Sequence, residues 1–280
     1  MKTTIPEELK RDLPANKWGK LLIVTPVVMT VVATLLAGLA SSEMTRAQYD
    51  RALGAQLQSK AGDQWNYFQA KKLRGAMQRN SLELLQAIGE VNPKDIFNLP
   101  PVPATPVFSV DPSVQLALQA VEKQQTEDEI AGVLKTVADG TLASSLRSAR
   151  EAMLGFEKAT EPLNQALERT EKLLSPGDRT AARDFAASRM RLSGARYDSE
   201  ARLNQSVANL YELQVRKANL SAERHRRRSS KFFLGMLSAQ AAVIMATFAV
   251  AAQKRSFLWT VAAIAGIAAI GFAIYVYLQV

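Results

Sequence analysis

LLIVTPVVMTVVATLLAGLASS, residues 21–42, contains no charged residue. The hydrocarbon core of a bilayer is about 30 Å thick, and an α-helix needs about 20 apolar residues to cross it. We therefore expect a transmembrane helix here, and Pro26 lies in its first turns, where a missing N–H costs little. A cleaved signal peptide is the alternative, because Gly38 and Ala40 offer small residues for cleavage. The apolar region of a signal peptide is usually only about 7–15 residues long. This run is longer, which favours a retained anchor.

Two further uncharged runs lie at the other end of the chain, at residues 232–253 and 256–280. Only Lys254 and Arg255 separate them, so they are predicted to form a tight hairpin of two more spans. Charged residues make up 22% of the chain and lie outside these runs, which excludes an ordinary soluble globule. The sequence predicts an all-α membrane protein with three transmembrane helices, preceded by a polar segment at residues 1–20.

Basic and aromatic residues gather where the uncharged runs begin and end. Tryptophan rings prefer the headgroup region, and lysine and arginine favour anionic headgroups. The predicted membrane-surface anchor comprises Lys17, Trp18, Lys20, Arg224, Arg226, Arg227, Arg228, Lys231, Lys254, Arg255 and Trp259.

The positive charges also predict an orientation. Short loops and the first helix usually dominate topology, and both are basic on the side of the N-terminus. This places residues 43–231 in the periplasm or otherwise outside the cytoplasm. The arginine cluster at residues 224–228 favours the opposite orientation, although long domains translocate largely regardless of charge.

The region between the first two spans, residues 43–231, is predicted to be a long helical-hairpin, coiled-coil-like domain. Six of the eleven prolines fall in residues 91–112, which must therefore be an extended connector. At its end, Asp111 is the predicted N-cap of the next helix, and Pro112 occupies the first helical position. A Ser-Pro-Gly-Asp break occupies residues 175–178. The helices are expected at residues 44–90, 114–138, 142–174 and from 179 onward, with a pause at 139–140.

Residues for catalysis or metal binding are scarce. The chain has no cysteine, and its one histidine, His225, lies inside a run of arginines that would repel a metal cation. A zinc site needs three or four ligands, and neither a phosphate-binding glycine loop nor a nucleophile elbow is present. We expect no catalytic residue, cofactor or metal. The net charge of +9 lacks a recognised nucleic-acid module, so no nucleic-acid partner is expected.

Small residues recur every four positions in the first span, at Thr30, Thr34 and Gly38. Such stripes allow helix backbones to approach closely, either within one chain or between subunits, and both uses remain open. Because the amphipathic helices also need partners for their apolar faces, we expect a homo-oligomer.

SKAGDQWNYFQAKK, residues 59–72, is the most distinctive segment of the predicted helix. Trp65 and Phe68 share one helix face and are predicted to hold this helix against the returning basic helix. A ligand site gated by Trp65 and Tyr67 is the alternative.

With the basic-aromatic loop at residues 254–259, this segment resembles an uncharacterised family of bacterial membrane proteins, domain of unknown function 4337, over residues 16–90 and 220–280. The resemblance implies a bacterial inner-membrane protein and supplies no activity. A non-enzymatic, membrane-anchored scaffold or assembly protein is therefore the leading expectation, and a pore formed by oligomerised spans is the alternative.

Overall fold

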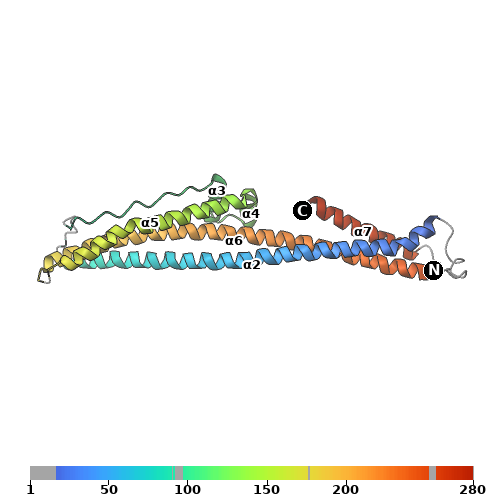
Figure 1. Cartoon of the computed structure of the whole chain (residues 1–280), viewed down its shortest axis with the longest axis horizontal. Helices are drawn as coiled ribbons and strands as arrows, with labels where there is room; N and C mark the ends of the chain where they lie inside the picture. The colour runs from blue at the N-terminus through green and yellow to red at the C-terminus, as the bar shows by residue number, and fades with distance from the viewer. Residues whose placement is uncertain (1–16, 90, 92–96, 176, 252–256, 280) are drawn as a thin grey trace, which may run out of the picture. The chain divides into compact units, whose positions relative to one another are not determined.

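The computed structural model describes residues 17–89, 91, 97–175, 177–251 and 257–279. Within these residues the chain is helical and has no strand, which confirms the all-α class. The helices of this described part are α2 (Lys17–Ile88), α3 (Pro112–Glu122), α4 (Glu127–Thr136), α5 (Asp139–Leu173), α6 (Arg179–Ala251) and α7 (Phe257–Gln279) (Figure 1).

The chain divides into two compact units. Met1–Ala52 and Asn219–Val280 make up the terminal unit, and Leu53–Ala218 make up the central unit. Both α2 and α6 contribute residues to each unit.

Two helices are long and apolar enough to cross a membrane by length and composition. These are Val24–Ile88 within α2 and Arg179–Phe248 within α6, which contain most of the first two predicted spans. A third crossing, predicted at residues 256–280, is not found by the same criterion among the described residues, although α7 is helical there.

Small side chains let the three helices of the terminal unit pack closely. A Cβ added at Gly266 of α7 would lie 3.1 Å from Met29 Sδ of α2, so the absence of a side chain there lets the two helices approach without displacing Met29. The core that these helices share comprises Ala33, Leu36, Ala40, Phe232, Ala239 and Ala269.

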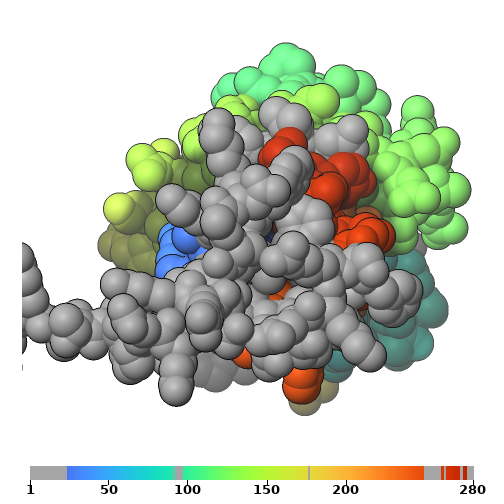
Figure 2. All heavy atoms as spheres, turned by 90° about the vertical axis from the view of Figure 1, so that its right-hand side faces the viewer, coloured from blue at the N-terminus to red at the C-terminus, as the bar shows by residue number. Residues whose placement is uncertain are grey.

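The outer faces of the same helices expose large apolar side chains, which we call the apolar belt. A soluble monomer rarely exposes so continuous an apolar surface. Atoms of α6 (orange) and α7 (red) reach the surface in the end-on view of Figure 2. The belt comprises Val27, Val31, Leu35, Leu39, Phe233, Leu234, Leu237, Ile264, Ile267 and Ile270.

In the central unit, α6 lies between α2 and α5 (Figure 1). Trp65 Nε1 on α2 donates a 2.7 Å hydrogen bond to Glu212 Oε1 on α6. On the other side, Arg189 of α6 pairs with Glu171 of α5 at 2.7 Å. Because it has neighbours on both sides, α6 buries much of its surface, including Leu203, Val207 and Leu210.

The described part of the proline-rich connector, residues 97–111, contains no α-helix, as predicted. It packs against the central unit, where the rings of Phe97 and Phe185 meet edge to face with centroids 5.5 Å apart. Thr105 Oγ1 donates to Ser199 Oγ at 3.0 Å. The predicted N-cap at its end is confirmed, since Asp111 Oδ1 accepts from the Ser113 N–H at 2.9 Å and Pro112 begins α3.

The prediction of one helix over residues 114–138 was wrong. The chain breaks after Lys123, where Gln124 adopts a left-handed φ of 52°. Thr126 then caps α4 through a capping box, in which its backbone N–H donates to Glu129 Oε2 at 3.0 Å. The predicted pause at residues 139–140 was also wrong, because Asp139 begins α5.

Candidate functional site

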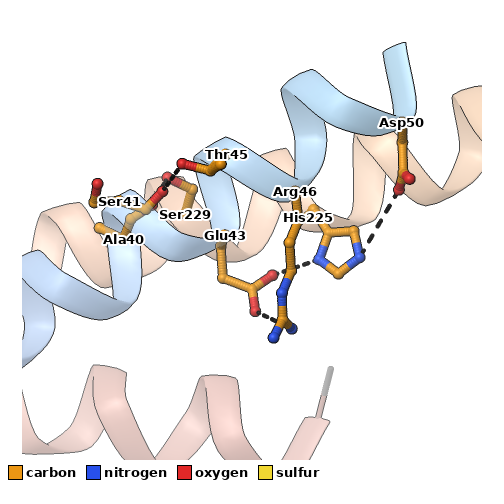
Figure 3. A network of polar contacts seen from close by, with 8 residues as sticks. All are labelled: Ala40, Ser41, Glu43, Thr45, Arg46, Asp50, His225 and Ser229. Carbon is orange, nitrogen blue, oxygen red and sulfur yellow. Dashed lines mark hydrogen bonds and ion pairs between the residues drawn. The ribbon is translucent and has the colours of Figure 1, made fainter. Parts of the chain in front are cut away.

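A cluster of polar groups, several of them buried or partly buried, joins α2 and α6 within the terminal unit (Figure 3). His225 Nδ1 lies 2.5 Å from Glu43 Oε2, and the other ring nitrogen, Nε2, lies 3.9 Å from Asp50 Oδ2. The imidazole therefore lies between two carboxylates that come from the facing helix.

Helical spacing brings these groups together. Glu43 and Asp50 are seven residues apart on α2, so they share one face, and His225 and Ser229 are one turn apart on α6. Ser229 Oγ donates a buried 2.7 Å hydrogen bond to the Ala40 carbonyl, one turn before Glu43. These contacts lie on successive turns of both helices, so together they set the register in which α2 and α6 pair.

The environment of His225 differs from what the arginine run suggested. Two carboxylates face it, and Glu43 is only 9% exposed. Arg46 Nη1 lies 3.5 Å from the other oxygen of Glu43, but this arginine is largely exposed. A sequence signal existed: Glu43 and Asp50 follow the first uncharged run, and His225 precedes the second, so antiparallel pairing of those runs aligns them.

This cluster places one imidazole between two carboxylates of the facing helix. A carboxylate on Nδ1 orients the imidazole, as a positioning partner does in many sites. Among the described residues, however, no group of three or more histidine, cysteine, aspartate or glutamate side chains could hold a metal ion. The geometry is that of an interlock between two helices.

The predicted membrane anchor is described only in part. Its α6 portion, which we call the basic band, comprises Arg224, Arg226, Arg227, Arg228 and Lys231. The side chains of Lys17, Trp18, Lys20 and Trp259 are not described, and Lys254 and Arg255 lie outside the described residues.

The two ends of the basic band have different partners. A hydrogen bond from Arg227 lowers the pKa of Glu223, and the nearby charges of Arg226 and Arg51 lower it further. At the other end, Lys231 Nζ lies 4.3 Å above the ring of Tyr275 on α7. A cation over an aromatic face is favourable, so this contact helps to hold α7 beside α6.

The small-residue stripe of the first span faces away from the chain's own helices. Thr30 and Thr34 are exposed, and their hydroxyls donate to the carbonyls one turn earlier, at Pro26 and Thr30. A Cβ at Gly38 would have no neighbour within 4 Å. Among the described residues, close packing within the chain uses the face of Ala33 and Leu36 instead of this stripe. Contact between subunits stays a prediction.

In the central unit, Trp65 and Phe68 lie together. Their rings meet edge to face with centroids 5.4 Å apart, and the indole hydrogen bond to Glu212 joins α2 to α6. Tyr67 is exposed and, two residues from Trp65, points to a different side of the helix. The two rings therefore do not line one ligand site.

A second polar network, which the sequence did not predict, links α2, α5 and α6. Lys71 pairs with Glu200, and Arg196 donates to Asn164. Arg196 Nε lies 3.5 Å from Glu200 Oε1, and its guanidinium carbon lies 4.7 Å from the centre of the Tyr197 ring. These groups are partly buried and engage one another, so they fix how the helices align.

Comparison with known proteins gives one match. Residues 18–103 match the model of a family described as a domain of unknown function, DUF4337. The resemblance found from the sequence is thus confirmed over α2 and the start of the connector, whereas residues 220–280 lie outside the match. No curated protein and no solved structure matches the chain.

Proposed function

We propose that this protein is a non-enzymatic scaffold or assembly protein of the bacterial inner membrane. In this proposal α2, α6 and α7 each cross the bilayer, and the helical residues 43–231 lie outside the cytoplasm. The apolar belt carries the proposal, because all three helices expose large apolar side chains that lipid would cover. Exposed arginines adjoin the belt on α6, which is the pattern of a membrane–water interface.

The packing of α7 supports a third span. This helix has 23 residues, enough for a core about 30 Å thick. Ala269 belongs to the shared core, and the ring of Tyr275 contacts Lys231 near the polar end of the belt. A helix with these neighbours would enter the same bilayer as α2 and α6.

Unpartnered faces support a homo-oligomer. The stripe of Thr30, Thr34 and Gly38 is exposed, and its hydroxyls are already satisfied by the helix itself. A second helix could therefore approach it closely without leaving a polar group unpaired. In the central unit, α2 also exposes Leu73 and Met77 on one face.

A pore is the second candidate, because the same stripe places hydroxyl-bearing residues on the outer face of α2. Several copies arranged around an axis could turn Thr30 and Thr34 toward a shared channel. Ion flux from liposomes containing the full chain separates the two candidates. We expect no flux above that of empty liposomes for a scaffold, and a flux blocked by Thr34→Leu for a pore.

Cysteine labelling tests the topology. The chain has no natural cysteine, so single cysteines at Ser113 and Ser256 are unique targets. An impermeant maleimide applied to intact cells should label the cysteine at position 113 and not the one at position 256. The reverse result would place residues 43–231 in the cytoplasm. Labelling of both positions would contradict a three-span arrangement.

Light scattering with the detergent contribution subtracted tests the oligomer. We expect a particle of several chains, and a smaller particle for Gly38→Ile, because the new side chain would block close helix approach. Gly271→Ile is the matched control, since Gly271 also faces open space in the terminal unit. A wild-type mass of one chain would refute the oligomer. An unchanged Gly38→Ile particle would refute only this contact face.

A further inference from the structure

Charge is not balanced at the polar end of the apolar belt. The terminal unit's described residues include the carboxylates of Glu43, Asp50 and Glu223. Glu43 and Asp50 face His225, and Glu223 Oε1 accepts from Arg227 Nε at 3.1 Å. These carboxylates are therefore already engaged, while the basic band still holds further cations.

The cations that remain lie on one face of α6. Arg224, Arg228 and Lys231 are spaced by four and then three residues, which aligns them along the helix. None of them forms an ion pair with another described residue. Arg228 Nε is buried and has no hydrogen-bond acceptor in the described part of the chain. The rest of this guanidinium is only partly buried, so a face with three cations that lack ion pairs is suited to an anion.

The cationic face continues directly into the apolar belt. Leu234 follows Lys231 by three residues on the same side of α6 and is exposed. The ring of Tyr275, which underlies Lys231, belongs to α7 and is also exposed. An occupant that matches this surface needs a negative group beside Arg228 and an apolar group beside Leu234.

We propose that Arg228, with Arg224 and Lys231, binds the phosphate of an anionic phospholipid. A phosphate oxygen accepts from the partly exposed guanidinium of Arg228, and an acyl chain lies along Leu234. Guanidinium groups are well matched to phosphate, and a lipid supplies both parts of the surface in one molecule. A zwitterionic lipid fits less well, because its own cation would meet three others. This inference rests on the proposed membrane anchoring.

Native mass spectrometry of the full chain in mild detergent tests the site. The chain is titrated with phosphatidylglycerol, with phosphatidylcholine of the same acyl chains, and with inorganic phosphate. We expect retention of phosphatidylglycerol in preference to the other two. Arg228→Gln should weaken it about fivefold, and Arg228→Gln with Lys231→Gln about 25-fold, since each cation near a membrane surface contributes a similar factor.

Arg226→Gln with Arg227→Gln is the matched control. It removes two positive charges from the same helix, but both of these arginines pair with Glu223. We expect it to weaken phosphatidylglycerol binding by at most about fivefold, because Glu223 already offsets one of the two charges. Circular dichroism checks that each variant keeps its helix content.

Three results would overturn the site. These are an equal loss in both double variants, equal binding of phosphatidylcholine, and displacement of the lipid by millimolar inorganic phosphate. Alkaline carbonate extraction of wild-type membranes distinguishes a failure of the lipid-site proposal from a failure of the proposed membrane anchoring. A chain that resists extraction but does not prefer phosphatidylglycerol refutes the lipid site alone. A chain released by carbonate refutes the membrane anchoring as well.

Discussion

Removing the Glu43 carboxylate should loosen the pairing of α2 and α6 in the terminal unit. Glu43→Ala leaves His225 Nδ1 without its partner at 2.5 Å. Loss of one partner from a fully buried ion pair costs about 3–5 kcal/mol. A hydrogen bond to a charged group contributes about 1.5–3 kcal/mol. Because these side chains are 11% and 18% exposed, we expect about 2–3 kcal/mol for Glu43→Ala.

Hydrogen exchange measured by mass spectrometry reports this opening locally. Peptides that cover residues 40–50 and 222–232 should exchange about 30- to 140-fold faster in Glu43→Ala, since about 1.4 kcal/mol corresponds to a factor of ten. A double-mutant cycle with His225→Ala isolates the contact, and its coupling energy should be about 1.5–3 kcal/mol.

Arg46→Gln is the control for this cycle. Arg46 also approaches Glu43, at 3.5 Å, but its side chain is 62% exposed. An exposed ion pair contributes about 0–1 kcal/mol, so exchange should change by less than about fivefold. A Glu43–His225 coupling energy below about 0.5 kcal/mol would refute the interlock. An effect of Arg46→Gln as large as that of Glu43→Ala would indicate general electrostatics instead.

Three further predictions concern the central unit. Gln124→Gly should stabilise it by about 0.5–1 kcal/mol in thermal unfolding, because glycine adopts the left-handed φ of 52° without strain. Trp65→Phe should destabilise it by about 1–2 kcal/mol, since Glu212 loses its indole donor; an unchanged unfolding midpoint would show that water replaces this bond. Hydrogen bonds from Ser113 lower the pKa of Asp111, so its cap stabilises α3 above the ordinary aspartate pKa and is lost as pH falls through the lowered pKa. Protection factors of the α3 amides, corrected for the intrinsic exchange rate at each pH, should therefore fall in acid for the wild type, and Asp111→Asn should remove that dependence.

Local features of the sequence were enough to establish the helical class and most helix ends. Uncharged runs, and the absence of proline from residues 27–92 and 177–280, indicate long helices, and α2 and α6 are continuous through them. The break before α4 was also predictable, because Thr126 and Glu129 form a capping-box pattern that our interpretation overlooked. Each of these features depends on residues within a few positions of one another.

Tertiary structure was needed to show which faces and which side chains meet. The first span is apolar on all sides, so hydrophobic periodicity cannot separate a lipid-facing side from a packed one. The small residues at Gly38 and Ala33 look equivalent in sequence, yet only Ala33 lies in the core. Glu43 and His225 are 182 residues apart, and only the antiparallel alignment of α2 and α6 brings them into contact. His225 is flanked by arginines in the sequence but lies between two carboxylates in the structure, because its nearest negative charges in space come from another helix.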